Sequence, residues 1–483
     1  MNNLGTEPKS RWGRVLLCAA LFRLIFLIWS WLPWLAEPQD GMSRLYFKEG
    51  YGLAVGYGYI SSEANGGPQL KALYELIEDQ HVPVTAETAP PLDRHNVWPE
   101  MLHPPGMAIL IGGLYRLFHL PADIPLEIVG LLLDSISAAL LCVLVARVWS
   151  PSLGYAAGLG YAFFPPLAYG AASSRSPEGL MGVFITVTVY CVWMAIKAAP
   201  QRWWWWSLLA GLALGVGSYF RPDYLLLPVA LGLGAWAITR QFWVSVRNLL
   251  TVQIIALALL LPWAWRNHEL SGRWIFTSTS VGPTLITGLG EFDNPWGFGG
   301  SDRDRGKEAA AQGFVGPWSP EADAYFRGVF WQSVAQHPWG YGVSVAKRLP
   351  LAVAPPLDWG LQNPWKDETF LAARQNEHQD RYAVLTARFG HTLLAYGDEL
   401  VVAGVCLLAL VGWGWLLFRE RNRWALGAFL LCPHLYAVGS HILTHFEPRF
   451  LLPSLGWLLI ALAYGIVTIG ETKNRLSKMP GQI

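Results

Sequence analysis

The stretch that decides the fold is 101-MLHPPGMAILIGGLYRLFHL-120, which either crosses a membrane or lies on one. Its apolar part, Met107–Leu120, offers only about 21 Å of helix at 1.5 Å per residue, whereas a hydrocarbon layer is about 30 Å thick. Gly112, Arg116 and His119 would share one face of that helix. We therefore predict a helix that lies on the outer surface of the membrane and does not cross it.

The composition is that of a membrane protein. Of the 483 residues, 53% are hydrophobic and only 14% are charged, which is too apolar for an ordinary soluble protein. The five cysteines lie inside apolar runs and form neither a disulfide framework nor a CxxC metal motif. The sequence therefore predicts an all-α polytopic membrane protein.

We expect about 10 transmembrane helices, from apolar runs near 14–35, 125–146, 153–169, 179–197, 205–220, 223–239, 248–265, 397–418, 424–443 and 450–470. The first run has a basic start but lacks a cleavage site of small residues, so we expect a retained signal anchor. With these spans every short inside connection is basic, as the positive-inside rule requires. An eleventh crossing at 107–120 would place the later basic connections outside. Both termini are thus expected in the cytoplasm of a plasma (inner) membrane protein.

The spans divide the chain into three parts. We expect a transmembrane catalytic module at 1–265 with a first large outer loop at 36–124, an extracytoplasmic loop region at 266–396, and C-terminal transmembrane helices at 397–483. The middle part is rich in Gly, Pro, Trp and charge, which predicts irregular structure with short helices. No internal repeat is evident, unlike transporters built from repeated halves.

Two acids stand where outer loops meet helices. Asp40 follows the first span, with Arg44 one turn later if that segment is helical, and Glu178 begins an apolar helix. Taken singly, Asp40 and Ser176 could be helix caps, and Glu178 could complement a helix dipole. The topology, however, places both acids on the same face of the membrane, so together they indicate a site.

Further polar candidates share that face: His103, Arg221, Arg266, Asn267 and Arg449. A single arginine there more often snorkels to lipid headgroups, but several that converge would suit a phosphate. His441 and His445 are spaced i, i+4, as in some metal sites, yet no third ligand is evident from the sequence.

Taken in order, these segments resemble the GT-C superfamily of polyprenyl-phosphate-sugar-dependent glycosyltransferases. The likeness is to the bacterial branch akin to protein O-mannosyltransferases and the lipid A aminoarabinose transferase. It rests on the first-loop acid and, in order, on YFKEGYGLAVGYGY (46–59), HPPGMAILIGGLYRLF (103–118), SRSPEGL (174–180), GLALGVGSYFRPDYLLLP (211–228), PWAWRN (262–267), QHPWGYGVSVAKR (336–348) and EPRFLLPSL (447–455). It spans nearly the whole chain.

The resemblance implies an inverting transfer of a sugar from a polyprenyl-phosphate donor to an acceptor hydroxyl. Asp40 would be the base and Glu178 the second-loop acid, and Arg44 would lie near the donor phosphate. Because Asp40 is followed by Gly41 and not by a second acid, Glu37 and Glu49 are rival bases. Arg221 and Arg449 are further phosphate candidates.

The partners follow from the same resemblance. The acceptor would be a lipid, a glycan or a protein, at a site that faces the extracytoplasmic side among membrane lipids. We expect no nucleic acid partner, and no nucleotide-binding glycine-rich loop is evident. A divalent metal, Mg²⁺ or Mn²⁺, occurs in some members, although this sequence shows no ligand set that requires one.

The competing class is a lipid or glycan transporter or flippase, which would place ionisable residues within the spans. The predicted spans contain few ionisable residues, namely Arg23, Asp134 and His434. The acids and arginines collect instead at one surface of the membrane. A noncatalytic scaffold would instead tolerate changes at Asp40. The distribution of charge favours the enzyme.

Overall fold

The computed structural model describes residues 11–30, 41–61, 67–93, 95, 97–172, 176–199, 201–355, 357 and 397–477. Within these ranges the chain is helical, and its β-structure is a single isolated bridge between Ile60 and Pro99. The prediction of an all-α polytopic membrane protein is confirmed.

The bundle contains apolar helices of 7 to 30 residues: α1 (Arg11–Ser30), α5 (Asp123–Val148), α6 (Pro151–Ala162), α7 (Pro165–Ala172), α8 (Pro177–Lys197), α9 (Trp203–Phe220), α10 (Leu227–Thr239), α11 (Phe242–Ser271), α18 (Gly397–Arg419), α19 (Trp424–Leu443), α20 (Leu452–Leu458) and α21 (Ile460–Ser477). The 3₁₀ turns η3 (Pro222–Tyr224), η5 (Arg421–Arg423) and η6 (Pro448–Leu451) join some of them. Seven stretches of the described chain are long and apolar enough to cross a membrane. The other predicted spans, near 14–35, 153–169 and 205–220, coincide with α1, the α6–α7 pair and α9.

The span expected at 153–169 is divided into two helices. α6 ends at Ala162, and α7 begins at Pro165. Proline has no N–H to donate and its ring clashes with the preceding turn, so Pro165 and Pro166 interrupt the helix. α7 then lies close to α8, because a Cβ on Gly179 would meet the carbonyl oxygen of Gly170 at 1.9 Å. This contact fixes the start of α8.

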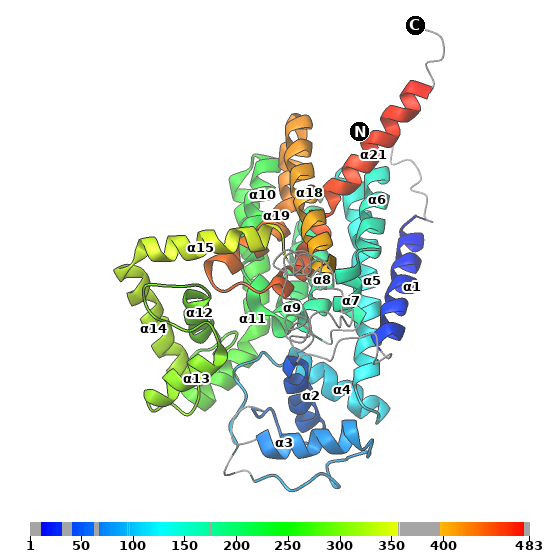
Figure 1. Cartoon of the computed structure of the whole chain (residues 1–483). Coiled ribbons are helices and arrows are strands. Elements are labelled where there is room, and N and C mark those ends of the chain that lie inside the picture. The colour runs from blue at the N-terminus through cyan, green and yellow to red at the C-terminus, as the bar shows by residue number, and fades with distance from the viewer. Residues whose placement is uncertain are drawn as a thin grey trace, which may run out of the picture.

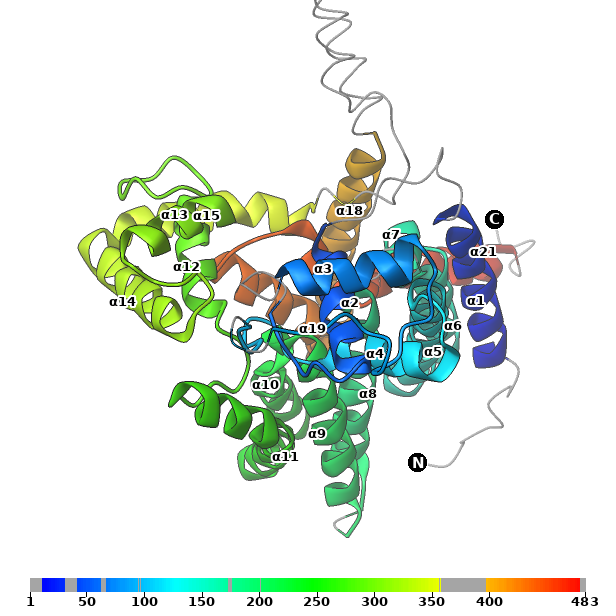
Figure 2. The ribbon, with the colours of Figure 1, turned by 90° about the horizontal axis from the view of Figure 1, so that it is seen from below.

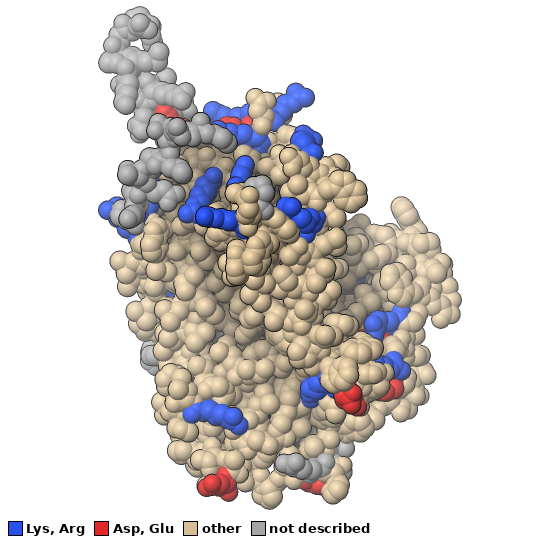
Figure 3. Space-filling model, turned by 180° about the vertical axis from the view of Figure 1, so that it is seen from behind, with Lys and Arg blue, Asp and Glu red and all other residues tan. Residues whose placement is uncertain are grey.

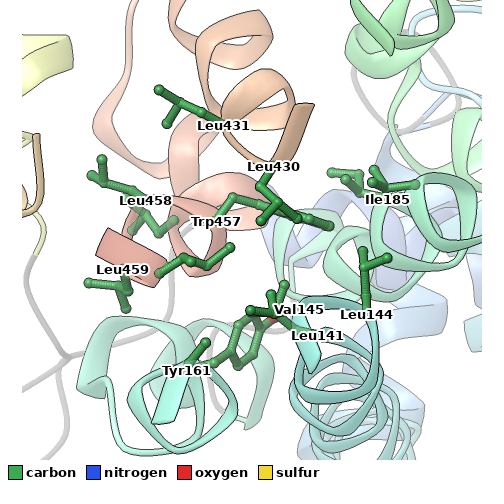
Figure 4. Packing of buried hydrophobic residues seen from close by; sticks show 14 of the residues in the cluster. Leu141, Leu144, Val145, Tyr161, Ile185, Leu430, Leu431, Trp457, Leu458 and Leu459 are labelled. Atoms are coloured by element: carbon green, nitrogen blue, oxygen red, sulfur yellow. The ribbon is translucent and has the colours of Figure 1, made fainter. Parts of the chain in front are cut away.

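One hydrophobic core joins the N-terminal and C-terminal helices. It includes Leu144 of α5, Ile185 of α8, Leu430 of α19 and Trp457 of α20. Figure 4 shows side chains from these helices pointing toward one another. Segments far apart in the sequence can therefore contribute to one site.

A polar triad ties α1 to the bundle. Arg23 is fully buried and pairs with Asp134 of α5, which also accepts a hydrogen bond from the Tyr161 hydroxyl. Arg23 further donates to the carbonyl oxygens of Ala19 at 3.2 Å and Ala162 at 2.9 Å. The charged residues within the first spans thus bind one another, which is the usual structural use of such pairs.

Basic residues gather at the end of the bundle where α1 begins and α21 ends (Figures 1 and 3). The guanidinium of Arg423 lies 5.6 Å from the ring centre of Trp149, and that of Arg240 lies 5.9 Å from Trp424. Arg147 and Lys197 end α5 and α8 at the same end. The helices therefore alternate in direction as the positive charges predicted.

The opposite end is covered by short helices: α2 (Gly41–Ala54), α3 (Gly67–Tyr74), η1 (Glu75–Asp79, a π-helix) and α4 (Gly106–Phe118). Figure 2 shows α2, α3 and α4 in front of the bundle when it is seen from this end. α4 has 13 residues and is too short to cross a hydrocarbon layer of about 30 Å. Its Gly112 packs against the backbone of Gly50 in α2, where a Cβ would meet an oxygen at 2.6 Å. The geometry supports the surface position expected for residues 107–120.

A second group lies beside the bundle: α12 (Val281–Gly290), α13 (Asp302–Ala311), α14 (Pro320–Gln336) and α15 (Pro338–Val353). It has its own small core around Phe326 and Phe330. Fully buried Arg348 of α15 donates to Glu291 at 2.6 Å and to the carbonyl oxygen of Ile442 in α19 at 2.8 Å. The short helices predicted within 266–396 are thus present and anchored to the bundle.

Candidate active site

Glu178 stands at the start of α8, at the end of the bundle opposite the basic end. Its side chain is only 3% exposed. Oε1 pairs with Nη1 of Arg221 and lies 3.8 Å from Nε of Arg449. Oε2 is buried and has no hydrogen-bond partner among the residues that the structure describes. Ser176, expected as a cap, makes no side-chain capping hydrogen bond.

The two arginines come from segments more than 200 residues apart. Arg221 follows α9, and Arg449 lies in η6 after α19. Arg221 also donates to Asp223 at 2.7 Å, and Arg449 pairs with Glu447 at 2.6 Å. The ring of Phe450 contacts both guanidinium groups, at 4.3 Å from Arg221 and 5.7 Å from Arg449. The fold therefore brings together Glu178, Arg221 and Arg449, which the sequence had named separately.

Two further residues, Tyr46 and His441, border the group formed by Glu178, Arg221 and Arg449, which we call the arginine cluster. Tyr46 of α2 is buried, and burial together with the nearby Glu178 carboxylate raises the pKa of its hydroxyl. His441 of α19 lies 3.9 Å from Asp223, and its ring is 4.8 Å from that of Phe450. The packing of α2 and α19 places these two residues beside the cluster, whereas the sequence had singled out His441 only for its i, i+4 spacing with His445.

The cluster is closed on one side and open on the other. Glu178 is buried, whereas the side chain of Arg449 is 34% exposed and that of Glu447 is 36% exposed. An arginine that is held on one side and exposed on the other can bind an incoming phosphate oxygen through a charge-assisted hydrogen bond. The arrangement suits an anionic ligand that arrives from the surface.

Of the first-loop candidates, Arg44 and Glu49 lie on α2, and the other two lie outside the described residues. Asp40 and Glu37 lie outside the described residues, and α2 begins at Gly41. Arg44 is exposed on α2, while Tyr46 faces inward to the cluster. Within the described part of the chain Arg44 forms no ion pair with Glu178. Glu49, one turn beyond Tyr46, is buried.

Arg266 and Asn267 bind the chain's own backbone. Arg266 donates to the carbonyl oxygens of Glu100 at 2.8 Å and Tyr59 at 3.0 Å, and Asn267 donates to Ile275 at 3.0 Å. The Arg266–Glu100 contact holds the segment before α4 against α11, and the Asn267 contact holds the chain that follows α11. The structure therefore shows both residues in positioning contacts, outside the arginine cluster.

His103 belongs to a second polar cluster. Its Nδ1 lies 3.8 Å from an oxygen of Glu49 and 3.8 Å from one of Glu100. Its ring is 4.8 Å from that of Tyr46, which joins the two clusters. Burial, and then the Glu49 charge, raises the pKa of Glu100 to about 7. Among the described residues this is the one group of His, Cys, Asp and Glu close enough to share a metal ion.

His441 and His445 both border the arginine cluster through the ring of Phe450, and neither belongs to a group of metal-ligand geometry among the described residues. His445 pairs with Glu291 through Nδ1 and lies 3.2 Å from Glu447 through Nε2. Burial lowers the pKa of His445, but the hydrogen bonds to both glutamates outweigh it and raise the pKa to about 9. His445 is thus a cation that links α12 to the arginine cluster.

Comparison with known proteins gives a family for one third of the chain. Residues 102–265, which include His103, Glu178 and Arg221, match the family described as dolichyl-phosphate-mannose-protein mannosyltransferase. No curated protein matches the sequence.

Two solved structures of ArnT from Cupriavidus metallidurans, one in the apo state and one bound to undecaprenyl phosphate, align with 89% of this chain and 77% of theirs. Both have 16% identity and a TM-score of 0.39, which is too low to transfer the position of any residue. The family match and the membrane helices, together with the resemblance of the motifs, lead to one conclusion: the chain is a membrane glycosyltransferase of the GT-C type.

Proposed function

We propose that this enzyme transfers a sugar from a polyprenyl-phosphate donor to an acceptor hydroxyl on the extracytoplasmic face, with inversion at the anomeric carbon. The observation that carries the proposal is the convergence of Arg221 and Arg449 on buried Glu178 at one end of the bundle. The relative bound to undecaprenyl phosphate agrees with a lipid-phosphate donor.

The chemistry needs cations more than it needs an acid. A sugar on a lipid phosphate already has a good leaving group, so protonation of that group is dispensable. Developing negative charge on the phosphate is stabilised by preorganised donors. Arg449, which is partly exposed, binds the phosphate first, and Arg221 is held behind it by Glu178 and Asp223.

A base must take the proton of the acceptor hydroxyl. Asp40 immediately precedes α2, whose Tyr46 reaches the arginine cluster, and we assign the base to Asp40. Glu178 orients the acceptor through Oε2, the oxygen not used by Arg221. Direct attack on the anomeric carbon inverts its configuration.

The remaining candidates act around this centre. Arg44 contacts the donor phosphate from the exposed face of α2, and His103 contacts the substrate beside Tyr46. Arg266 holds the segment that carries His103, and Asn267 accepts a hydrogen bond from Arg266 at 2.9 Å. The positive-inside rule places the basic end of the bundle in the cytoplasm, so this site faces outward from a plasma (inner) membrane.

The experiment is transfer by purified protein from radiolabelled polyprenyl-phosphate sugars to a membrane extract. We expect Asp40→Asn and Glu178→Gln each to lower turnover by roughly 100-fold or more while donor binding persists. Glu321→Gln, an exposed acid in the first turn of α14, is the matched control. The anomeric configuration of the product, read by NMR, tests inversion.

If Asp40→Asn retains full activity, Asp40 is not the base, and Glu37 or Glu49 is the next candidate. Movement of the donor across vesicles without any sugar transfer would refute the enzyme and favour a flippase. A product that retains its anomeric configuration would refute direct attack.

A further inference from the structure

The outer helix group, α12 to α15, holds the loop that leads from α19 to Arg449. The buried guanidinium of Arg348 on α15 donates to the carbonyl oxygen of Ile442 at 2.8 Å. At Gly288 of α12, a Cβ would meet the carbonyl oxygen of Thr444 at 1.8 Å, so the two backbones are in close contact. The loop therefore has little room to move relative to the outer helix group.

Glu291, at the end of α12, joins this group to the loop through both carboxylate oxygens. Oε2 accepts a hydrogen bond from Nε of Arg348 at 2.6 Å, and this guanidinium balances the negative charge of the carboxylate. Oε1 accepts a hydrogen bond from the Phe446 N–H at 2.9 Å and also pairs with Nδ1 of His445. One side chain, only 13% exposed, thus holds both the backbone and a side chain of the loop.

From His445 the ion pairs continue to the arginine cluster. Nε2 of His445 lies 3.2 Å from Oε1 of Glu447, and Oε2 of Glu447 lies 2.6 Å from Nε of Arg449. Arg449 in turn lies 3.8 Å from Glu178. We call this series of alternating charges the charge chain; it consists of Arg348, Glu291, His445, Glu447, Arg449 and Glu178. The charge chain connects α15 with the start of α8.

The arginine cluster needs the positive charge of His445 if it is to attract a phosphate. Its two guanidinium groups pair with three carboxylates, those of Glu178, Asp223 and Glu447. These groups by themselves leave an excess of one negative charge, which repels an anion. A protonated His445 offsets that charge, because it pairs with Glu447.

The surroundings of His445 determine how readily it keeps its proton. Burial lowers the pKa of His445, but the hydrogen bonds to Glu291 and Glu447 outweigh burial and raise the pKa to about 9. Without Glu291 one carboxylate acts against burial, so His445 loses its proton at a lower pH. The charged and titratable groups near His445 are Glu291 at the end of α12, Asp302 of α13, Arg348 of α15, His441 of α19, Glu447 of the loop and Arg449 of η6.

We propose that Glu291 is a positioning residue for donor binding, which acts through the charge chain to keep the guanidinium of Arg449 available to the donor phosphate. The inference rests on the proposed function, because it takes Arg449 as a contact of that phosphate. Loss of Glu291 releases the Phe446 N–H and lets His445 become neutral. Glu447 is then offset by Arg449 alone, which leaves Arg449 less able to bind a second anion.

The test measures the affinity of the full-length protein in detergent for decaprenyl phosphate, by quenching of tryptophan fluorescence at two pH values. At about pH 8, where His445 is neutral in the variant, we expect Glu291→Gln to bind roughly 5-fold or more weakly than the wild type. At about pH 5.5, where His445 is protonated in both proteins, the difference should be less than about 2-fold. The probe's own titration is the same for both proteins, so it cancels in this ratio. A purely structural defect would not vary with pH in this way.

Three further variants sharpen the test. Glu291→Asp keeps the negative charge and should restore most of the affinity at about pH 8. In the His445→Gln background, Glu291→Gln should change the affinity by less than about 2-fold at either pH, because the chain is already interrupted. Glu308→Gln is the matched control and should bind as the wild type does, since Glu308 is a 24% exposed acid that pairs with Arg305 of α13 outside the charge chain.

The possible outcomes separate this inference from the proposed function. If the wild type binds decaprenyl phosphate and Glu291→Gln binds it equally well at both pH values, or loses the same affinity at both, the positioning role is wrong. If the wild type binds the probe at neither pH, the lipid-phosphate donor itself is refuted, and this inference with it.

Discussion

The triad around Arg23 and the cluster around Glu178 both contain a buried acid beside an arginine, yet they differ in how much of the arginine is exposed to solvent. Arg23 is 0% exposed and binds Asp134 and two backbone carbonyl oxygens. At the second cluster, Arg449 is 34% exposed and Glu178 retains an oxygen without a hydrogen-bond partner in the described chain. A closed ion pair in a bundle holds helices together, whereas one that is open on a single side can accept a ligand.

The largest effect is expected at the closed pair. Asp134→Leu leaves the Arg23 guanidinium buried without its carboxylate, which costs about 3–5 kcal/mol in comparable buried pairs. We expect a large fall in folded yield and in the melting temperature of the purified protein. The double variant Arg23→Leu/Asp134→Leu removes both charges and should recover most of the loss. A single variant as stable as the wild type would show that the pair does not hold α1.

The second effect is expected at the open arginine. Arg449→Gln removes a charged donor to phosphate, worth about 1.5–3 kcal/mol, so donor binding should weaken by roughly 10- to 150-fold. Arg449→Lys keeps the positive charge but loses the planar guanidinium, so its affinity for the donor should lie between those of the wild type and Arg449→Gln. Binding of a polyprenyl phosphate, followed by quenching of tryptophan fluorescence, measures the loss.

Arg327→Gln is the control for this variant, because Arg327 is 47% exposed and pairs with Asp323 on α14, outside the cluster. Unchanged donor binding in Arg449→Gln, or an equal loss in the control, would remove Arg449 from the donor site. The melting temperature should change little in either variant, in contrast to Asp134→Leu.

The difference between the two regions also explains what the sequence could predict. Hydropathy locates the spans, and the basic connections fix their direction, so Glu178, Arg221 and Arg449 can be assigned to one end of the bundle before any coordinates are known. That they meet depends on how α8, α9 and α19 pack, which no local pattern contains. The break in the helix at Pro165 does not reverse the chain direction, so the later residues are still assigned to the correct end of the bundle.

Residues in the outer segments were harder to assign. Arg266 and Asn267, which the sequence predicts to bind substrate, also donate hydrogen bonds to backbone carbonyl oxygens, and such contacts have no sequence signature. For the same reason Glu100 was not recognised as a neighbour of His103 and Glu49. Glu100 reaches them because Arg266 fixes its loop. Polar residues outside the spans are placed by such long-range hydrogen bonds, whereas residues inside the spans follow helix geometry.

His445 offers an intermediate case, with a side chain 15% exposed. Its pKa is raised to about 9, so its ion pairs contribute stability that is complete below the ordinary pKa of about 6.5 and is lost as the pH rises through 9. Glu447, with its pKa lowered to about 2, loses its contribution only in strong acid. We expect the melting temperature of the wild type to fall between pH 6.5 and 9 and that of His445→Gln to change less. Parallel pH profiles for the two proteins would contradict a charged His445.

The smallest effect is expected from the ring between the two arginines. Phe450→Leu keeps apolar volume but removes the aromatic face that contacts Arg221 and Arg449. A partly exposed cation–π contact is worth about 0.5–1 kcal/mol, so the KM for the donor should rise about 2- to 5-fold with kcat nearly unchanged. Phe292→Leu, which removes a similar contact with Lys347 outside the cluster, is the matched control. A fall in kcat at constant KM would instead mean that the ring acts on the reacting groups, and the open cluster would then be preorganised for the transition state and not only for donor binding.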